Sequence, residues 1–341
     1  MISYLIGCVF AFGFSVGLLM AQLLSFRKRS ADEADERRKH FLTTGSPITP
    51  GVRHEYGWNP NSRGMLLFQQ QYIPQGKLKG VVGFCHGYSE CSATHQREVA
   101  MKFCARGFAV ITYDAEGHGF SDGLHVYIKD LKDISGDASD YFSKQMKREV
   151  FQDCSFFILG ESMGGAVSFN LSTLHEVHSI ISGVVLVCPM VKVSDEMRPP
   201  QVVVTLLTLL AYYLPYAPLA PVPDAMEKAV KRADVLARMR LSPLAYHQLP
   251  RLATAVAMLN ATNSIGNSME ALSLPLLILH GSADVVTDPR LSQELYDRCS
   301  SKDKEIRILP GVWHNLLHGE EAHDCAAHVG HILDWIEKRA K

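Results

Sequence analysis

The chain has no excess of charge of either sign. Its 341 residues carry 34 basic and 35 acidic side chains, for a formal net charge of −1. A protein that binds the phosphate backbone of a nucleic acid usually shows a surplus of Lys and Arg, so we expect no nucleic acid partner. With 47% hydrophobic residues, the chain can instead bury a full core, as one large domain with an appendage.

The sequence also lacks paired cysteine motifs. Its eight cysteines are scattered, and several lie in strand-like apolar runs. This scatter argues against a disulfide framework. Neither H-E-x-x-H nor a Cys/His ligand spacing occurs, which argues against a metal site. We expect reduced, buried thiols and no cofactor. Histidines gather near the C-terminus, where we interpret them as a solvated helix face: His314, His318, His323, His328 and His331.

Charged side chains are missing from residues 2–26. At about 1.5 Å rise per residue, this stretch is long enough to cross a hydrocarbon core of roughly 30 Å. Three basic residues follow at 27–29, an asymmetry that would put the body of the protein in the cytosol. We therefore predict a single-pass membrane anchor at residues 1–29, in the endoplasmic reticulum or another endomembrane. A cleaved signal peptide is the alternative, but it needs a positive leading flank and a shorter apolar run.

The rest of the chain divides into a linker and one α/β domain. Residues 30–50 mix charges with Gly and Pro, which favours a juxtamembrane linker. In residues 51–341, short apolar runs alternate with longer helix-like stretches, as in a doubly wound, mostly parallel sheet with helices on both faces. The predicted strands are 66–73, 81–85, 109–113, 156–159, 184–188, 276–279 and 306–309, and the predicted final helix is about 322–338.

The alternation breaks at about residues 190–250, where we predict an inserted helical cap. Residues 202–214 form an apolar run, and four prolines follow within the next nine positions. Thirteen residues is short for a membrane span, and the prolines prevent its extension, so a cap or interfacial helix is the better interpretation. An ordinary core helix is the alternative. An apolar cap would favour apolar substrates and could itself contact a membrane.

A serine motif follows the predicted strand at 156–159. Residues 160–165 read Gly-Glu-Ser-Met-Gly-Gly, which fits G-x-S-x-G in a strand-turn-helix context. The sharp turn strains the serine backbone, and the two flanking glycines remove the side chains that would collide there. We predict Ser162 as a nucleophile whose Oγ lies at a helix N-terminus, where free N–H groups favour an oxyanion.

A serine nucleophile needs a base and an acceptor that orients the base. In this kind of site the chain order is Ser, then Asp or Glu, then His. Asp284 and His314 each follow a predicted strand, so both lie on loops at the carboxyl edge of the sheet. We predict a catalytic triad of Ser162, His314 and Asp284, with Asp288 as the second choice for the acid.

Two backbone amides are expected to bind the oxyanion. One belongs to Met163, directly after the nucleophile, and the other should come from the loop after the strand at 81–85, which reads His-Gly-Tyr. We predict the N–H groups of Tyr88 and Met163 as the oxyanion hole. His86 is expected to be a structural hydrogen-bonding group beneath this loop.

In this order, the motifs resemble those of the monoacylglycerol lipase family of α/β-hydrolases, from about residue 50 to the C-terminus. The plant and protist branch, with its caffeoylshikimate esterase-like proteins, is most similar, because it carries Glu at the position of Glu161. The resemblance implies an eight-stranded sheet with a cap, a Ser-Asp-His esterase acting on monoacylglycerols or similar small esters, and a place for Glu90 near the polar glycerol end. The motifs are residues 86–88, Asp114 with 117–121, 160–165, the Asp284 loop and His314.

Other functions stay open at this level. A lysophospholipase or a phenolic-ester esterase would share the same fold and triad. An acyltransferase would use the H-x-x-x-x-D match from His125 to Asp130, a short pattern that occurs by chance in a chain with 15 histidines. A binding protein without catalysis is also conceivable on any enzyme fold, although every triad position is filled here.

Overall fold

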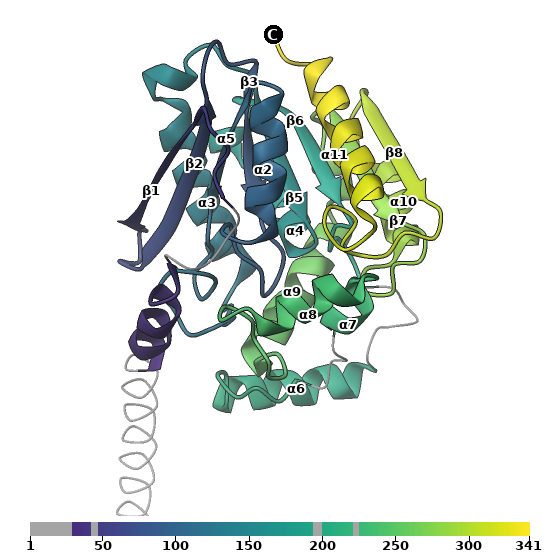
Figure 1. Ribbon diagram of the computed structural model, residues 1–341. Helices are drawn as coiled ribbons and strands as arrows, with labels where there is room; N and C mark the ends of the chain where they lie inside the picture. Colours follow the sequence, from purple (N-terminus) through teal and green to yellow (C-terminus); the bar gives the residue numbers. More distant parts are fainter. Residues whose placement is uncertain (1–28, 42–46, 194–199, 221–224) are drawn as a thin grey trace, which may run out of the picture.

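An eight-stranded sheet forms the centre of the molecule (Figure 1). The computed structural model describes residues 29–41, 47–193, 200–220 and 225–341. Across the sheet the strand order is β1-β2-β4-β3-β5-β6-β7-β8, and only the β1–β2 and β2–β4 pairs are antiparallel. The predicted mostly parallel sheet is therefore confirmed. The strands are β1 (Val52–Pro60), β2 (Leu66–Pro74), β3 (Gly80–Cys85), β4 (Phe108–Tyr113), β5 (Phe156–Glu161), β6 (Ile181–Val187), β7 (Leu276–Gly281) and β8 (Lys304–Leu309).

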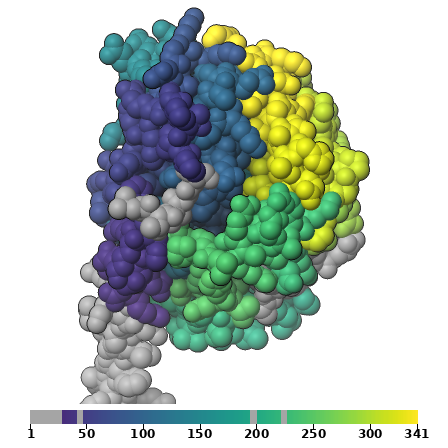
Figure 2. All heavy atoms as spheres, in the orientation of Figure 1, coloured from purple at the N-terminus to yellow at the C-terminus, as the bar shows by residue number. Residues whose placement is uncertain are grey.

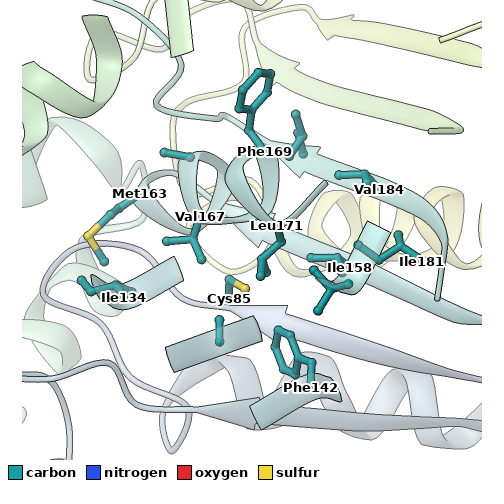
Figure 3. Close-up of a cluster of buried hydrophobic side chains, with 14 of the residues drawn as sticks. Cys85, Ile134, Phe142, Ile158, Met163, Val167, Phe169, Leu171, Ile181 and Val184 are labelled. Carbon is teal, nitrogen blue, oxygen red and sulfur yellow. The ribbon is translucent and has the colours of Figure 1, made fainter. Parts of the chain in front are cut away.

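Helices cover both faces of this sheet. Because side chains alternate along a strand, the central strands send apolar residues to two separate cores. One core packs against α3, α4 and α10, and Figure 3 shows part of it around Phe142, Ile158 and Leu171. The other core packs against α2 and α11. The helices are α2 (His95–Ala105), α3 (Leu131–Met146), α4 (Met163–Thr173), α5 (His175–His178), α10 (Pro289–Arg298) and α11 (Ala322–Glu337), with short 3₁₀ turns η2 (Glu149–Phe151) and η3 (Met269–Ala271).

The chain between β6 and β7 carries four helices at one end of the sheet (Figure 1). The longest, α9, is tied to the loop after β4, because Thr254 Oγ1 accepts from the amide of Ile128 at 2.9 Å and donates to the carbonyl of Val126 at 3.1 Å. The predicted apolar helix at 202–214 is present as α6. These helices are α6 (Gln201–Tyr213), α7 (Ala225–Ala229), α8 (Ala233–Leu241) and α9 (Leu252–Gly266).

Residues 29–38, of which all but the first were expected to be a linker, form a helix. In the space-filling view this segment lies beside the chain between β6 and β7 (Figure 2). Arg37 of this helix is buried and donates to the carbonyls of Gly119 (2.6 Å), Ser121 (2.7 Å) and Gly123 (3.1 Å). Burial lowers the pKa of its guanidinium to about 10. These bonds attach the helix to the loop that follows β4.

The prediction of a single-pass membrane protein needs correction. In the part of the chain that the structure describes, every helix is too short or too polar to cross a membrane. The predicted anchor at residues 1–29 lies, except for its last residue, outside the described residues. The prediction depended on the length and hydropathy of an apolar run and on the basic residues after it, which do not separate a spanning segment from other uses of such a run. The predicted placement in a membrane, with a cytosolic domain, is therefore not retained.

Candidate active site

Ser162 occupies a strained turn between β5 and α4. Its φ is 55° and its ψ is −116°, a backbone conformation that residues with a side chain rarely adopt. The turn is held on both sides, because the amide of Ser162 donates to the carbonyl of Val187 and its carbonyl accepts from the amides of Gly165 and Met190 at 2.9 and 3.0 Å. This strained turn between a strand and a helix is the geometry that the G-x-S-x-G motif predicts.

The two flanking glycines are required by close backbone contacts. A Cβ on Gly160 would lie 2.2 Å from the carbonyl oxygen of Gly164, and a Cβ on Gly164 would lie 2.1 Å from that of Cys85. Both distances are far below van der Waals contact, and backbone atoms cannot move away cheaply. The motif therefore fixes the packing of α4 against β3 as well as the conformation of the turn.

Asp284 and His314 lie together after β7 and β8. The Nδ1 of His314 is 2.7 Å from Oδ2 of Asp284, and both side chains are buried. Because Nδ1 donates to the carboxylate, Nε2 is left as the basic nitrogen of the ring. Asp288 is not part of this pair, because its carboxylate caps α10 by accepting from the amide of Arg290 at 2.9 Å.

Asp284 is held ionised by the donors around it. Burial alone would raise its pKa, but hydrogen bonds from His280 and His314, together with the charges of these two rings, outweigh burial and hold the pKa well below the usual range. Burial would likewise lower the pKa of His314, but the hydrogen bond and charge of Asp284 raise it above the ordinary histidine value. The pair is thus arranged to stabilise an imidazolium.

His280, which the sequence did not single out, is a second histidine on the same carboxylate. It is fully buried, with Nε2 3.0 Å from Oδ2 of Asp284 and Nδ1 2.7 Å from the hydroxyl of Ser292. Cys188, His280 and Asp284 have the composition of a metal site. Here, however, hydrogen bonds already use the facing atoms of His280 and Asp284, so we assign His280 the structural role of a second donor to this carboxylate.

The serine and the histidine are not joined by a hydrogen bond. Among the described residues, Ser162 Oγ has no hydrogen-bond partner. The charge of Glu161, which precedes Ser162 in the chain, is one of the effects that raise the pKa of His314. In enzymes without substrate, catalytic hydrogen bonds are often long or poorly aligned.

The loop after β3 brings a fixed peptide to the nucleophile. A Cβ on Gly87 would lie 3.5 Å from Cβ of Ser162. The amide of Gly87 donates to Oε2 of Glu90 at 3.0 Å, and its carbonyl is 2.7 Å from Nδ1 of His86. Since Nε2 of His86 accepts from the amide of Ala115 at 2.9 Å, Nδ1 carries the proton and donates. His86 therefore has the structural role that was predicted.

The two amides predicted for the oxyanion hole are not used elsewhere. Within the residues that the structure describes, neither Tyr88 N–H nor Met163 N–H donates a backbone hydrogen bond. Met163 is the first residue of α4, where helical amides have no partner inside the helix. Both groups are thus available to an incoming oxygen. The hydroxyl of Tyr88 is buried without a partner, and burial raises its pKa.

Comparison with family models matches residues 76–321 to the family described as serine aminopeptidase, S33. The chain belongs to this family. Its predicted resemblance to monoacylglycerol lipases is confirmed by two curated relatives. Caffeoylshikimate esterase of Arabidopsis thaliana is 29% identical over 85% of this chain and 87% of that protein. Monoacylglycerol lipase of Mycolicibacterium smegmatis is 29% identical over 76% of this chain and 89% of that protein.

Solved structures agree on the fold of this family member. A soluble variant of monoglyceride lipase from Saccharomyces cerevisiae, in complex with a substrate analogue, matches with a TM-score of 0.74. The match covers 86% of this chain and 96% of the yeast chain, at 20% identity. The predicted class, an α/β-hydrolase related to monoglyceride lipases and esterases, is therefore confirmed.

Proposed function

We propose that this chain hydrolyses carboxylic esters of small lipids through a triad of Ser162, His314 and Asp284. The observation that carries the proposal is the hydrogen bond of 2.7 Å between His314 and Asp284, at the carboxyl edge of a sheet whose adjacent elbow presents Ser162 with a φ of 55°. A structural ion pair would need no strained serine nearby, whereas a nucleophile does.

In the proposed mechanism, Ser162 Oγ attacks the ester carbonyl while Nε2 of His314 takes its proton. Asp284 holds the ring in the correct tautomer and stabilises the imidazolium. The oxyanion accepts hydrogen bonds from the amides of Tyr88 and Met163, the imidazolium gives its proton to the leaving alcohol, and water activated by His314 then hydrolyses the acyl-enzyme.

Monoacylglycerols are the substrates that we propose first, with glycerol and a free fatty acid as products. Their support is the family itself and relatives named monoacylglycerol lipase and monoglyceride lipase. We propose Glu90 near the glycerol end, because its carboxylate lies on the loop that adjoins Ser162. The test is a panel of monoacylglycerols, lysophospholipids and phenolic esters, with Ser162→Ala as control. Removal of the nucleophile should cost about 10⁶-fold in kcat, and a Ser162→Ala protein with full activity would exclude the mechanism.

A phenolic-ester esterase is the second candidate. The observation that favours it is the match to caffeoylshikimate esterase, which covers 85% of this chain. In the same panel, a kcat/KM for caffeoyl esters above that for monoacylglycerols would favour this alternative.

The acyltransferase alternative has less support. Asp130 of the H-x-x-x-x-D match caps α3 by accepting from the amide of Lys132 at 2.9 Å. Burial lowers the pKa of His125 to about 3, which makes this ring a poor base. Full acyl transfer by the Ser162→Ala protein would reinstate the alternative.

We propose that α6 meets the lipid aggregates in which such substrates are dispersed. It belongs to the cap insertion at about residues 190–250, and its exposed apolar side chains at positions 202, 206, 209 and 213 follow helical spacing along one face. Val202 and Leu206 are 80% and 54% exposed. Leu206→Ser with Leu209→Ser should raise KM for dispersed monoacylglycerol and leave hydrolysis of a short, water-soluble ester unchanged. An equal effect on both substrates would contradict the proposal.

A further inference from the structure

Four ionisable side chains are buried together at the loop after β3, which carries the proposed oxyanion amide of Tyr88. Glu90 lies on that loop, His95 begins α2, Glu161 ends β5 next to Ser162, and His318 follows the last strand. Their side chains are only 11%, 9%, 1% and 7% exposed. We call this set the buried acid–histidine cluster.

His95 lies between the two carboxylates of the cluster. Its Nε2 is 3.4 Å from Oε2 of Glu161 and 3.6 Å from Oε2 of Glu90. The ring of His318 stacks on it, with centroids 3.6 Å apart and planes 15° apart. Nε2 of His318 is 3.0 Å from Nδ2 of Asn315, so this nitrogen accepts a hydrogen bond and the His318 ring is neutral.

Two buried carboxylates need a compensating charge. Both oxygens of Glu161 lack a hydrogen-bond partner in the described part of the chain, which would be costly for an isolated anion. Over the same residues, the side chains within 4.0 Å of Glu90 or Glu161 that could carry a positive charge are His95 and His318. Since two stacked rings cannot both carry charge cheaply, only one of them is the cation.

We propose that His95 is a positioning residue of the active site: as a buried imidazolium, it keeps Glu90 ionised and in place, and through Glu90 it fixes the peptide before the oxyanion amide of Tyr88. The inference rests on the proposed function. Burial would lower the pKa of His95, but the charges of Glu90, Glu161 and Glu98 raise it to about 9. The pKa of His318 lies well below the ordinary value because of burial and the charges of His95 and His314.

The path from His95 to the reacting atoms is short. Oε2 of Glu90 accepts from the amide of Gly87 at 3.0 Å, and Gly87 precedes Tyr88. Burial and the charge of Glu161 raise the pKa of Glu90, whereas the charges of His95 and His86 oppose this. If His95 lost its proton, Glu90 would lose the positive charge that opposes burial and the charge of Glu161, and the two carboxylates would repel each other. The acceptor for the Gly87 amide would then be displaced. The oxyanion amide would then be poorly aligned.

The decisive variant is His95→Gln, which keeps hydrogen-bonding capacity without the charge. We expect kcat to fall about tenfold, less than the hundredfold typical of deleting an oxyanion donor, with KM nearly unchanged. Wild type should lose kcat as pH rises through about 9, the pKa of His95, and the variant should lack this alkaline limb. The matched control is His54→Gln, at a half-buried histidine that stacks on Tyr72 away from the cluster.

A second variant separates charge from folding. Adding Glu161→Gln to His95→Gln replaces one of the two carboxylates with a neutral amide. We expect the kcat of the double variant to be at least threefold above that of His95→Gln. The proposal would be overturned if His95→Gln had the kcat of wild type and kept its alkaline limb. It would also be overturned if the loss of kcat in the double variant equalled the product of the losses in the two single variants. An inactive Ser162→Ala protein beside a normal His95→Gln protein would leave the proposed function standing.

A bound cation is the competing explanation. Ligand atoms of Glu90, His95 and His318 lie within 4.8 Å of one another. We expect full activity after dialysis against a chelator, because the proton on His95 supplies the charge. Loss of activity that added Zn²⁺ reverses would overturn the positioning role and make these residues metal ligands.

Discussion

At the scale of single residues, Asp284 shows how the site controls charge. Its Oδ1 accepts from the amides of Val286 and Thr287, and its Oδ2 accepts from the hydroxyl of Thr287 and from the rings of His280 and His314. Each of these donors stabilises the anion over the neutral acid. The carboxylate therefore stays ionised at any pH at which the protein would be assayed.

Replacing Asp284 with Asn should lower kcat about 10⁴-fold, because the amide cannot hold His314 in the correct tautomer. The acidic limb of the pH profile should move as well. In wild type, activity is lost as pH falls through the raised pKa of His314, and removing the charge of Asp284 lowers that pKa. The measurement is kcat/KM against pH for both proteins. An acidic limb at the same pH in both would contradict this coupling.

Gly164→Ala should destabilise the fold by about 3 kcal/mol, because its Cβ would lie 2.1 Å from the carbonyl oxygen of Cys85. The matched control is Gly136→Ala within α3, where no atom lies within 4 Å of the added Cβ. That substitution should stabilise by up to about 1 kcal/mol, since alanine favours a helix. Urea unfolding measures both, and equal midpoints would refute the role given to Gly164.

A pairing that follows from the order of motifs along the chain was predictable, and a pairing that arises only from folded contacts was not. Ser162 has a local motif, and the structure pairs Asp284 with His314 as the order along the chain predicts. His95 and His318 are 223 positions apart in the sequence and stack only in the folded chain. No periodicity or spacing could have indicated that contact.

At the scale of elements, the buried side chain of Arg37 is one of the groups that attach the helix at residues 29–38. Arg37→Ala would leave three carbonyls of the loop after β4 without their donor, and should cost about 2–3 kcal/mol. Lys39→Ala, at an exposed site of the same segment, should change stability by less than about 0.5 kcal/mol. Limited proteolysis near residue 40 should be faster in the first variant. Equal cleavage rates would show that Arg37 does not hold the helix.

The predicted strands from β2 to β8 are all present. For β3 to β7, the nearly continuous apolar runs correctly identified strands buried on both faces. The strand β1 was missed, because its half-buried, polar residues do not alternate cleanly. The helix at 29–38 was missed for a similar reason: its attachment depends on a buried arginine, and a sequence shows only that the residue is charged. The break in rhythm predicted a helical insertion at about residues 190–250, and the described residues there include α6, α7 and α8, but α8 and α9 had no separate signal.

At the scale of the whole molecule, the buried charges predict how stability depends on pH. The pKa of His95 is about 9 in the folded protein and about 6.5 in an unfolded chain. Its stabilisation is therefore full below about pH 6.5 and is lost as pH rises through about 9. The depressed pKa of Asp284 acts at the other end, because its contribution is present above about pH 4 and is lost as pH falls further.

The contribution of His95 to the melting temperature should accordingly be full below about pH 6.5 and decline towards pH 10. His95→Gln should cost about 1–3 kcal/mol at pH 6 and much less at pH 10, because wild type has lost the imidazolium there. Thermal unfolding of both proteins from pH 3 to pH 10 measures the difference. A constant difference across this range would mean that His95 is neutral in the folded state.

The sheet ends at β1 on one side and at β8 on the other. Both terminal strands carry charged side chains, Arg53 and Glu55 on one and Lys304, Glu305 and Arg307 on the other. Joining the sheet to that of another copy would remove water from these charges, a cost that offsets the added backbone hydrogen bonds. The charges on the two edge strands thus disfavour growth of the sheet into fibrils or amorphous aggregates at high concentration.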